Sequence, residues 1–344
     1  MRVVRQICLL LLIVPVLAFG ANADEVVPPG LNAETMKGLE LRPLGPAFMS
    51  GRISDIVLHP DDTNIKYVGV GSGGVFKTVN SGISWEPIFD GEGSYSIGCI
   101  TLDPNRPDTV WVGTGENVSG RHVGFGDGVY RSLDGGKSWT NMGLKKSEHI
   151  GMIRIDPRDS NIIFVAAQGP LWSGGGDRGL FKSVDGGKTW NKVLGAGEYT
   201  GVSEVLMDPR NPDVMYATTW QRLRTVASLM DGGPESGIHK STDGGNTWRE
   251  LTTGLPEEDM GKVGLAISPQ KPDVVYATIE LPGREGGFWR SEDSGETWEK
   301  RNEYLSSGTG PHYYQELFAH PHFFDRVYQA DVMLHFTSDG GKNF

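Results

Sequence analysis

Apolar and polar positions repeat along the chain in units of about fifty residues. Each unit begins with an apolar run that ends at a proline, and an aromatic residue follows seven positions later. The pairs are Pro60 and Tyr67, Pro104 and Trp111, Pro157 and Phe164, Pro209 and Tyr216, Pro269 and Tyr276, and Pro321 and Tyr328. Runs such as "HIGMIRIDP" are apolar on both faces, which predicts strands buried between two neighbouring layers.

A polar turn closes each unit, as in "KSVDGGKTW" at Lys182–Trp190. Its acid position is filled at intervals of 46 to 58 residues by Asn80, Asp134, Asp185, Asp243, Asp293 and Asp339. Short apolar runs such as "GLFKS" precede these turns, so each unit indicates four strands, here named A to D. We therefore predict an all-β fold, a β-propeller of four-stranded antiparallel blades. Six blades are visible, and an incomplete larger propeller stays open.

The acid of the repeated turn has two interpretations, a catalytic or metal-binding carboxylate and a structural turn residue. An Asp before two glycines can accept backbone N–H bonds across a tight turn, and the Trp that follows can pack over it. One copy carries Asn, and six copies exceed what one active site needs. We therefore predict a structural role for Asn80, Trp85, Asp134, Trp139, Asp185, Trp190, Asp243, Trp248, Asp293, Trp298 and Asp339.

Ser183, Asp185, Gly187, Thr189 and Trp190 match Ser-x-Asp-x-Gly-x-Thr-Trp, so the turn resembles the Asp-box, or bacterial neuraminidase (BNR) repeat. "GPAFMSGRISDI", "VWVGTGE" and "DRGLFKSVDGGKTW" resemble secreted bacterial proteins labelled sortilin N-terminal-domain-like or glycosyl hydrolase. The resemblance implies a propeller with the boxes at the blade periphery. Because such proteins are usually longer, we expect a truncated propeller, unless "LELRPLG" at 39–45 supplies a missing strand.

The N-terminus has the pattern of a cleaved signal peptide over residues 1–23, with Arg2 and Arg5, an apolar run over 7–19 and "ANA" at 21–23. A linker over 24–38 and the propeller over 39–344 follow, in a secreted or periplasmic protein. The formal charge of −11 argues against nucleic acid as a partner. No later segment is apolar enough for stable membrane insertion. Cys99 has no partner after cleavage and is expected to be a buried thiol.

The connections between strands B and C differ most in length, and variable loops on a rigid scaffold usually carry binding. The longest insertion, "WQRLRTVASLMDGGPESG", could lie across the mouth of the channel. Aromatic side chains beside charged ones suit sugar stacking or peptide capture. The candidate ligand-binding residues are Glu116, Arg121, His122, Trp172, Asp177, Arg178, Trp220, Arg222, Arg224, Arg284, Tyr313 and Tyr314.

The preferred hypothesis is extracytoplasmic recognition of a glycan or peptide, and the alternative is a glycoside hydrolase with an acid/base carboxylate pair in the B–C and D–A loops. Resemblance to xyloglucanases implies a catalytic base, an Asp, in blade 1, but Gly71 stands at the position of that Asp. Resemblance to sialidases implies an Arg-Ile-Pro segment, and none occurs. No catalytic residue, cofactor or metal ligand is predicted, because no HExxH, CxxC or complete calcium loop occurs.

Overall fold

The structure is a computed structural model that describes residues 52–195, 197–303, 314–331 and 333–344. All of these belong to one compact unit, Met49–Phe344; a second unit comprises Met1–Phe48. The predicted signal peptide, the linker and the expected strand at 39–45 lie outside the described residues. The domain boundaries at 23 and 38 therefore stay predictions.

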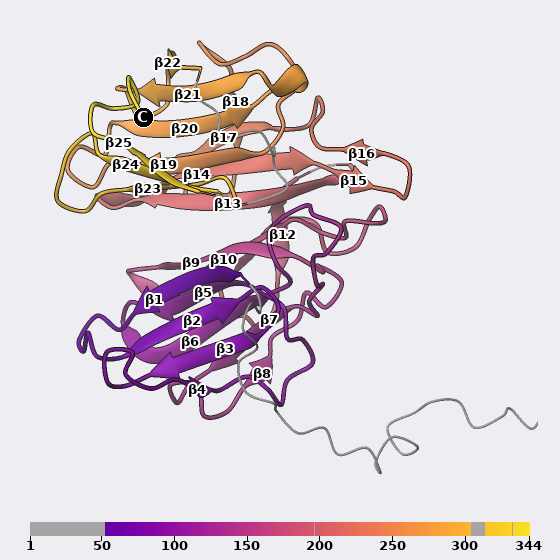
Figure 1. Ribbon diagram of the computed structural model, residues 1–344, viewed down its shortest axis with the longest axis vertical. Coiled ribbons are helices and arrows are strands. Elements are labelled where there is room, and N and C mark those ends of the chain that lie inside the picture. The colour runs from indigo at the N-terminus through magenta and orange to yellow at the C-terminus, as the bar shows by residue number, and fades with distance from the viewer. Residues whose placement is uncertain (1–51, 196, 304–313, 332) are drawn as a thin grey trace, which may run out of the picture. The chain divides into compact units, whose positions relative to one another are not determined.

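The described chain folds into consecutive antiparallel sheets, which we number blade 1 to blade 6 (Figure 1). Blade 1 contains β1 (Ile53–Leu58), β2 (Lys66–Val70), β3 (Gly74–Thr78) and β4 (Glu86–Pro87). Blade 2 contains β5 (Ile97–Asp103), β6 (Arg106–Thr114), β7 (Val129–Ser132) and β8 (Thr140–Asn141). Blade 3 contains β9 (Ile150–Asp156), β10 (Asp159–Ala167), β11 (Gly179–Ser183) and β12 (Asn191–Leu194).

The later blades vary this plan. Blade 4 contains β13 (Thr200–Asp208), β14 (Asn211–Gln221), β17 (Gly237–Ser241) and β18 (Arg249–Leu251). Between β14 and β17 lies a hairpin of β15 (Leu223–Arg224) and β16 (Leu229–Met230). Blade 5 contains β19 (Val263–Ile267), β20 (Val275–Glu280), the 3₁₀ turn η1 (Pro282–Arg284), β21 (Gly286–Ser291) and β22 (Glu299–Asn302). Blade 6 contains β23 (Glu316–Ala319), β24 (Val327–Ala330) and β25 (Leu334–Thr337).

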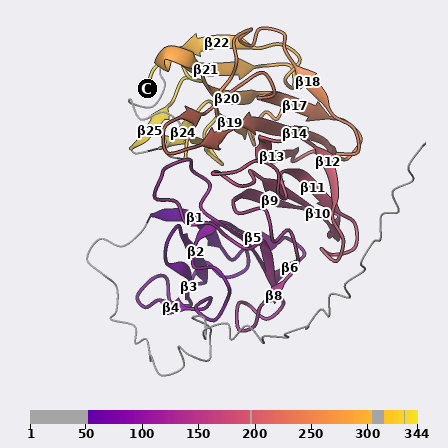
Figure 2. The same cartoon turned by 90° about the vertical axis from the view of Figure 1, so that its right-hand side faces the viewer.

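The prediction of an all-β propeller with six visible blades is confirmed. The first five blades have four strands each, and the described part of blade 6 has three. Figure 2 shows the blades following one another in chain order from indigo to yellow. Among the described residues, no helix is long and apolar enough to cross a membrane.

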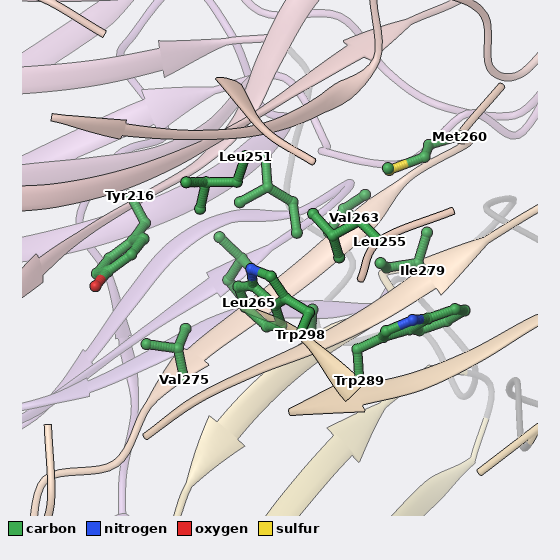
Figure 3. Packing of buried hydrophobic residues seen from close by; sticks show 12 residues of the cluster. Tyr216, Leu251, Leu255, Met260, Val263, Leu265, Val275, Ile279, Trp289 and Trp298 are labelled. Atoms are coloured by element: carbon green, nitrogen blue, oxygen red, sulfur yellow. The ribbon is translucent and has the colours of Figure 1, made fainter. Parts of the chain in front are cut away.

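Packing between neighbouring blades forms the hydrophobic core. Five apolar clusters occur among the described residues, and each joins one blade to the next. The cluster between blades 4 and 5 contains Tyr216, Leu251, Leu265 and Trp289, and Figure 3 shows Tyr216 and Trp289 on opposite sides of this group. Strand A is therefore apolar on both faces because each inner blade packs on two neighbours.

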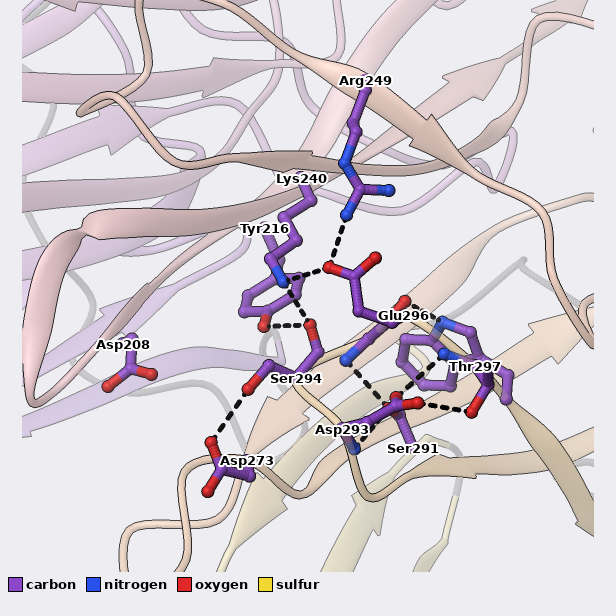
Figure 4. Close-up of polar contacts among 12 residues, drawn as sticks. Asp208, Tyr216, Lys240, Arg249, Asp273, Ser291, Asp293, Ser294, Glu296 and Thr297 are labelled. Carbon is purple, nitrogen blue, oxygen red and sulfur yellow. Dashed lines mark hydrogen bonds and ion pairs between the residues drawn. The ribbon is translucent and has the colours of Figure 1, made fainter.

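A repeated cation also joins the blades. The residue before the turn serine or threonine is Lys or Arg in blades 1 to 5, and it lies over the strand-B aromatic of its own blade. Lys240, for example, lies over Tyr216 and donates to Ser294 O at 2.7 Å in the turn of blade 5 (Figure 4). Lys182 likewise donates to Gly244 O at 2.7 Å. The same contact thus ties successive turns together.

The acid of the repeated turn binds the backbone of its own turn. Asp185 Oδ1 accepts hydrogen bonds from Lys188 N at 3.0 Å and Thr189 N at 2.9 Å, while Oδ2 accepts one from Thr189 Oγ1 at 2.6 Å. These bonds lower the pKa of Asp185 to about 2. In blade 1, Asn80 Oδ1 accepts from Ser84 N at 3.0 Å in the same way. Such geometry suits a structural turn, a role that stays a prediction.

Candidate functional site

The loop end of the blades, where the B–C and D–A connections lie, is held by a segment of blade 2 that we call the central segment, Glu116–Ser119. Asn117 Nδ2 donates to Glu316 Oε1 of blade 6 at 2.7 Å. Asn117 O accepts from Lys262 Nζ of blade 5 at 3.2 Å and from Gln168 Nε2 of blade 3 at 3.4 Å. One short loop therefore joins blades that are distant in the sequence.

The carboxylate of Glu116 anchors the central segment to the first and last blades. Arg52, immediately before β1, forms an ion pair with it, and Arg52 Nη2 lies 2.6 Å from Glu116 Oε2. Tyr314 OH donates to Glu116 Oε1 at 2.8 Å. Because the Glu116 side chain is fully buried, these two partners replace the water that it loses.

The long insertion of blade 4 lies against the same segment. Arg222 Nη1 donates to Val118 O at 3.2 Å, and Nη2 donates to Gly169 O of blade 3 at 3.1 Å. Arg224 Nε donates to Ser119 O at 2.9 Å. The loops of blades 2, 3 and 4 thus brace one another at the loop end, where the sequence pattern placed the insertion.

Carboxyl groups with raised pKa values surround Lys262 at this end. Burial raises the pKa of Glu316 to about 7 and, with help from the charge on Asp231, that of Glu280 to about 8. Burial also raises the pKa of Asp231 to about 6, although Arg222 opposes the shift. Lys262 is buried, and burial lowers its pKa against the attraction of Glu316 and Glu204. At neutral pH, Glu280 and a part of the Glu316 population therefore carry a proton.

Asp231 and Glu280 are neighbours in this group. Asp231 follows β16 in the insertion of blade 4, and Glu280 ends strand B of blade 5. Gly261 lies between the Glu280 carboxyl group and the backbone of Asp231: a side chain there would collide with Glu280 Oε2 and reach within 3.0 Å of the Asp231 backbone carbonyl oxygen. Both residues are half-buried, and Asp231 Oδ1 and Glu280 Oε2 are buried without a hydrogen-bond partner among the described residues. Two carboxyl groups with different pKa values can divide the roles of acid and base.

Several predicted ligand-binding residues instead hold the loops together. Arg178 is buried, and its guanidinium donates five hydrogen bonds to backbone carbonyl oxygens, among them those of Gln168 and Pro170. Trp220 is also buried, with Nε1 donating to Asp231 O at 3.2 Å. Arg222 is buried as well, and Asp177 Oδ2 accepts a hydrogen bond from Lys146 N at 2.8 Å. The hydrogen bonds of these side chains satisfy backbone groups of the long loops, a role that loop length alone does not reveal.

The remaining candidates differ in exposure. Arg121 and His122 are exposed, and they line a surface hollow of 490 Å³ together with the buried Arg224 and with Ala227, Ser228 and Leu229. Trp172 is exposed, whereas Tyr314 is buried against Glu116. Tyr313 and the side chain of Arg284 lie outside the described residues. The structure therefore brings three of the predicted residues together on one surface.

Sequence reasoning missed Asn117, Lys262 and Glu280. Glu280 ends an apolar strand, "VVYATIE", whereas the length pattern points only to charges inside long loops. Lys262 adjoins a glycine before a strand and carries no pattern that marks it as buried. Among the described residues, no three His, Cys, Asp or Glu side chains are grouped to hold a metal ion.

Comparison with known proteins shows partial matches. A family model described as Sortilin-Vps10, "Sortilin, neurotensin receptor 3", matches residues 127–262. A xyloglucanase of Hypocrea jecorina is 26% identical over 280 residues, covering 72% of this chain and 32% of that protein. An oligoxyloglucan-reducing end-specific xyloglucanase of Emericella nidulans is 25% identical over 228 residues, covering 60% of this chain and 25% of that protein.

Solved structures agree on the fold. The crystal structure of an ancestral GH74 enzyme superposes with a TM-score of 0.60 at 20% identity, covering 86% of this chain and 39% of the other. At that identity the likeness shows the fold alone. The chain spans 32% and 25% of the lengths of the two curated relatives above, so it matches only part of each.

Proposed function

We propose that this chain is a carbohydrate-acting propeller that hydrolyses glycosidic bonds of a xyloglucan-like polysaccharide at its loop end. The observation that carries this proposal is the Asp231–Glu280 pair, two half-buried carboxyl groups whose charges interact and whose pKa values are both raised. Relatives named as xyloglucanases support a glycan substrate. This proposal favours the hydrolase alternative over the binding function that we preferred from the sequence.

The chemistry follows from the two pKa values. Glu280, with a pKa of about 8, holds its proton near neutral pH and donates it to the leaving oxygen as the glycosidic bond breaks. Asp231, with a pKa of about 6, is largely ionised there and accepts a proton from the water that adds to the sugar carbon. The proton taken from water balances the proton given to the leaving sugar.

Recognition of the chain on either side of the cleaved bond uses exposed loop residues in this proposal. Trp172 offers a stacking face to a sugar ring, and the hollow around Arg121 and His122 offers hydrogen-bond donors. Action outside the cytoplasm is part of the proposal, since it depends on the predicted signal peptide over residues 1–23.

The test is a reducing-end assay on xyloglucan with Asp231→Asn and Glu280→Gln. Each change is expected to lower kcat by about 10²- to 10⁴-fold, the usual contribution of general acid–base catalysis. Glu296→Gln, at the opposite end of the blades, serves as the matched control and retains activity. Full activity in both loop-end variants, with melting temperatures unchanged, contradicts the assignment.

A second candidate, glycan or peptide binding without cleavage, is favoured by one observation. Gly71 occupies the position at which the xyloglucanase resemblance implies a base, and a side-chain carbon there would lie 2.6 Å from Glu116 Oε1. No carboxylate fits at that position while Glu116 is in place. Thermal stabilisation by oligosaccharides or peptides, without new reducing ends, supports this candidate over hydrolysis.

A further inference from the structure

The first and last described blades each leave exposed a face that every other blade buries. We call the face of a blade toward the next blade its forward face and the opposite one its rear face. On strand A, the residues four and two positions before the conserved proline lie on the rear face. They are buried or half-buried in blades 2 to 6, as with Ile153 and Ile155. In blade 1 the equivalent residues, Ile56 and Leu58, are 54% and 53% exposed.

The forward face of blade 6 is likewise exposed, whereas the forward faces of the other blades are buried. The strand-C residue three positions before the turn serine or threonine has no exposed surface in the other five blades, where it is Val75, Val129, Leu180, Ile238 and Phe288. In blade 6 this residue is Leu334, and it is 69% exposed. Phe336 and Phe318 on the same face are 53% and 52% exposed.

These two faces differ from ordinary surface because their residues are the ones used in the repeated blade-to-blade interface. Each of the five apolar clusters joins a forward face to the next rear face, and none of them joins blade 6 to blade 1. A cluster of large apolar side chains exposed to solvent usually marks an interaction site. Figure 2 shows β25 and β1 on the same side of the described chain.

We propose that one further blade of the same repeat docks between blade 6 and blade 1, with its rear face on Leu334 and Phe336 and its forward face on Ile56 and Leu58. The chemistry of this partner follows from continuity with the five existing interfaces. Its strand A carries apolar residues on the rear face, as blades 3, 4 and 5 do. Its strand B carries an aromatic residue on the forward face. This interface is independent of the proposed catalytic pair.

Thiol labelling tests the proposal without relying on stability. In a Cys8→Ser chain the remaining natural thiol, Cys99, is buried. Ile56→Cys and Leu334→Cys then report on the two faces, and Val129→Cys, at the position equivalent to Leu334 in blade 2, is the buried control. A second set of chains has residues 191–251 appended after Phe344. This segment supplies an outer strand followed by a complete blade, because Phe344 aligns with Trp190.

The expected result is rapid labelling of both cysteines in the chain alone and at least tenfold slower labelling in the extended chain. Equal reactivity with and without the added blade overturns the proposal. Slow labelling in the chain alone at every concentration also overturns it, because the N-terminal residues or closure of the ring would then cover the faces. Slow labelling only at high concentration overturns it in favour of a second copy of this chain.

Discussion

The two ends of the blades use buried and paired charges in different ways. At the turn end the same contact recurs: a Lys or Arg before the turn serine lies over an aromatic ring and donates to the next turn. At the loop end, single residues such as Glu116 and Lys262 make contacts of their own kind that join several blades. Repeated contacts therefore link successive turns at one end, and irregular buried charge marks the end where we propose chemistry.

The difference also appears in the direction of the pKa shifts. Turn acids such as Asp185 accept several hydrogen bonds, and the pKa falls to about 2. Loop-end acids such as Glu280 lose water without gaining enough donors, and the pKa rises to about 8. The ionised carboxylate is thus stabilised in Asp185 and the protonated carboxyl group in Glu280.

The largest expected effect on stability comes from Glu116→Ala. This change leaves the Arg52 guanidinium and the Tyr314 hydroxyl without their shared acceptor in a buried site. We expect the free energy of unfolding to fall by about 2–4 kcal/mol, below the full cost of breaking a buried pair because Arg52 is partly exposed. Urea denaturation measures it.

The control for this comparison is Glu296→Ala at the turn end, where the Glu296 side chain is 50% exposed while it pairs with Lys240 and Arg249. Such an exposed pair contributes about 0–1 kcal/mol. Equal losses of stability in the two variants would remove the proposed distinction between the ends.

A smaller effect is expected in the pH dependence of stability. The pKa of Glu280 is raised from 4.5 to about 8, so its folded form binds a proton more tightly than its unfolded form. Its contribution to stability is present below pH 4.5 and is lost as the pH rises through 8. The difference in unfolding free energy between the natural chain and Glu280→Gln is expected to decrease across that window. Because the side chain is only half-buried, solvent screening reduces the expected change to about 1–2 kcal/mol.

The same experiment on the turn acid has the opposite sign. Asp185 has a pKa lowered from 3.8 to about 2, so its contribution is present above pH 3.8 and is lost as the pH falls through 2. Chemical denaturation of Asp185→Asn and Glu280→Gln beside the natural chain, between pH 2 and 9, checks both signs. Parallel curves for the two variants would contradict the assignment of opposite shifts.

The smallest effect is expected from Asp185→Ala. Loss of the turn bonds lowers the melting temperature by about 2–4 °C, a shift typical of one weak contact in a large domain. Activity or binding per folded molecule stays unchanged, because the turn lies at the other end of the blade. Asp185→Asn is the matched control and is expected to cost less, since Asn80 makes equivalent bonds in blade 1. Lost activity at an unchanged melting temperature would refute the structural role.

The candidate site was only partly predictable from the sequence. Glu116 and Tyr314 were both selected as loop residues, and they form a direct hydrogen bond across 198 positions of the chain. Arg178 and Trp220 were selected for the same reason and are buried. Loop length indicates where the chain is free to vary. The burial of a loop residue depends on which other loops pack against it, and those loops belong to blades that are distant in the sequence.

By itself, the sequence determined the repeating unit, the strand order and the position of the turns, because each of these depends on contacts within about fifty residues. The proline–aromatic spacing and the Asp-Gly turns are local patterns of that kind. Only the tertiary structure decided which loop residues meet at the loop end and which blade faces stay exposed to solvent. Hydrogen bonds such as Asn117 to Glu316 join residues 199 positions apart, and no local pattern encodes such a pairing.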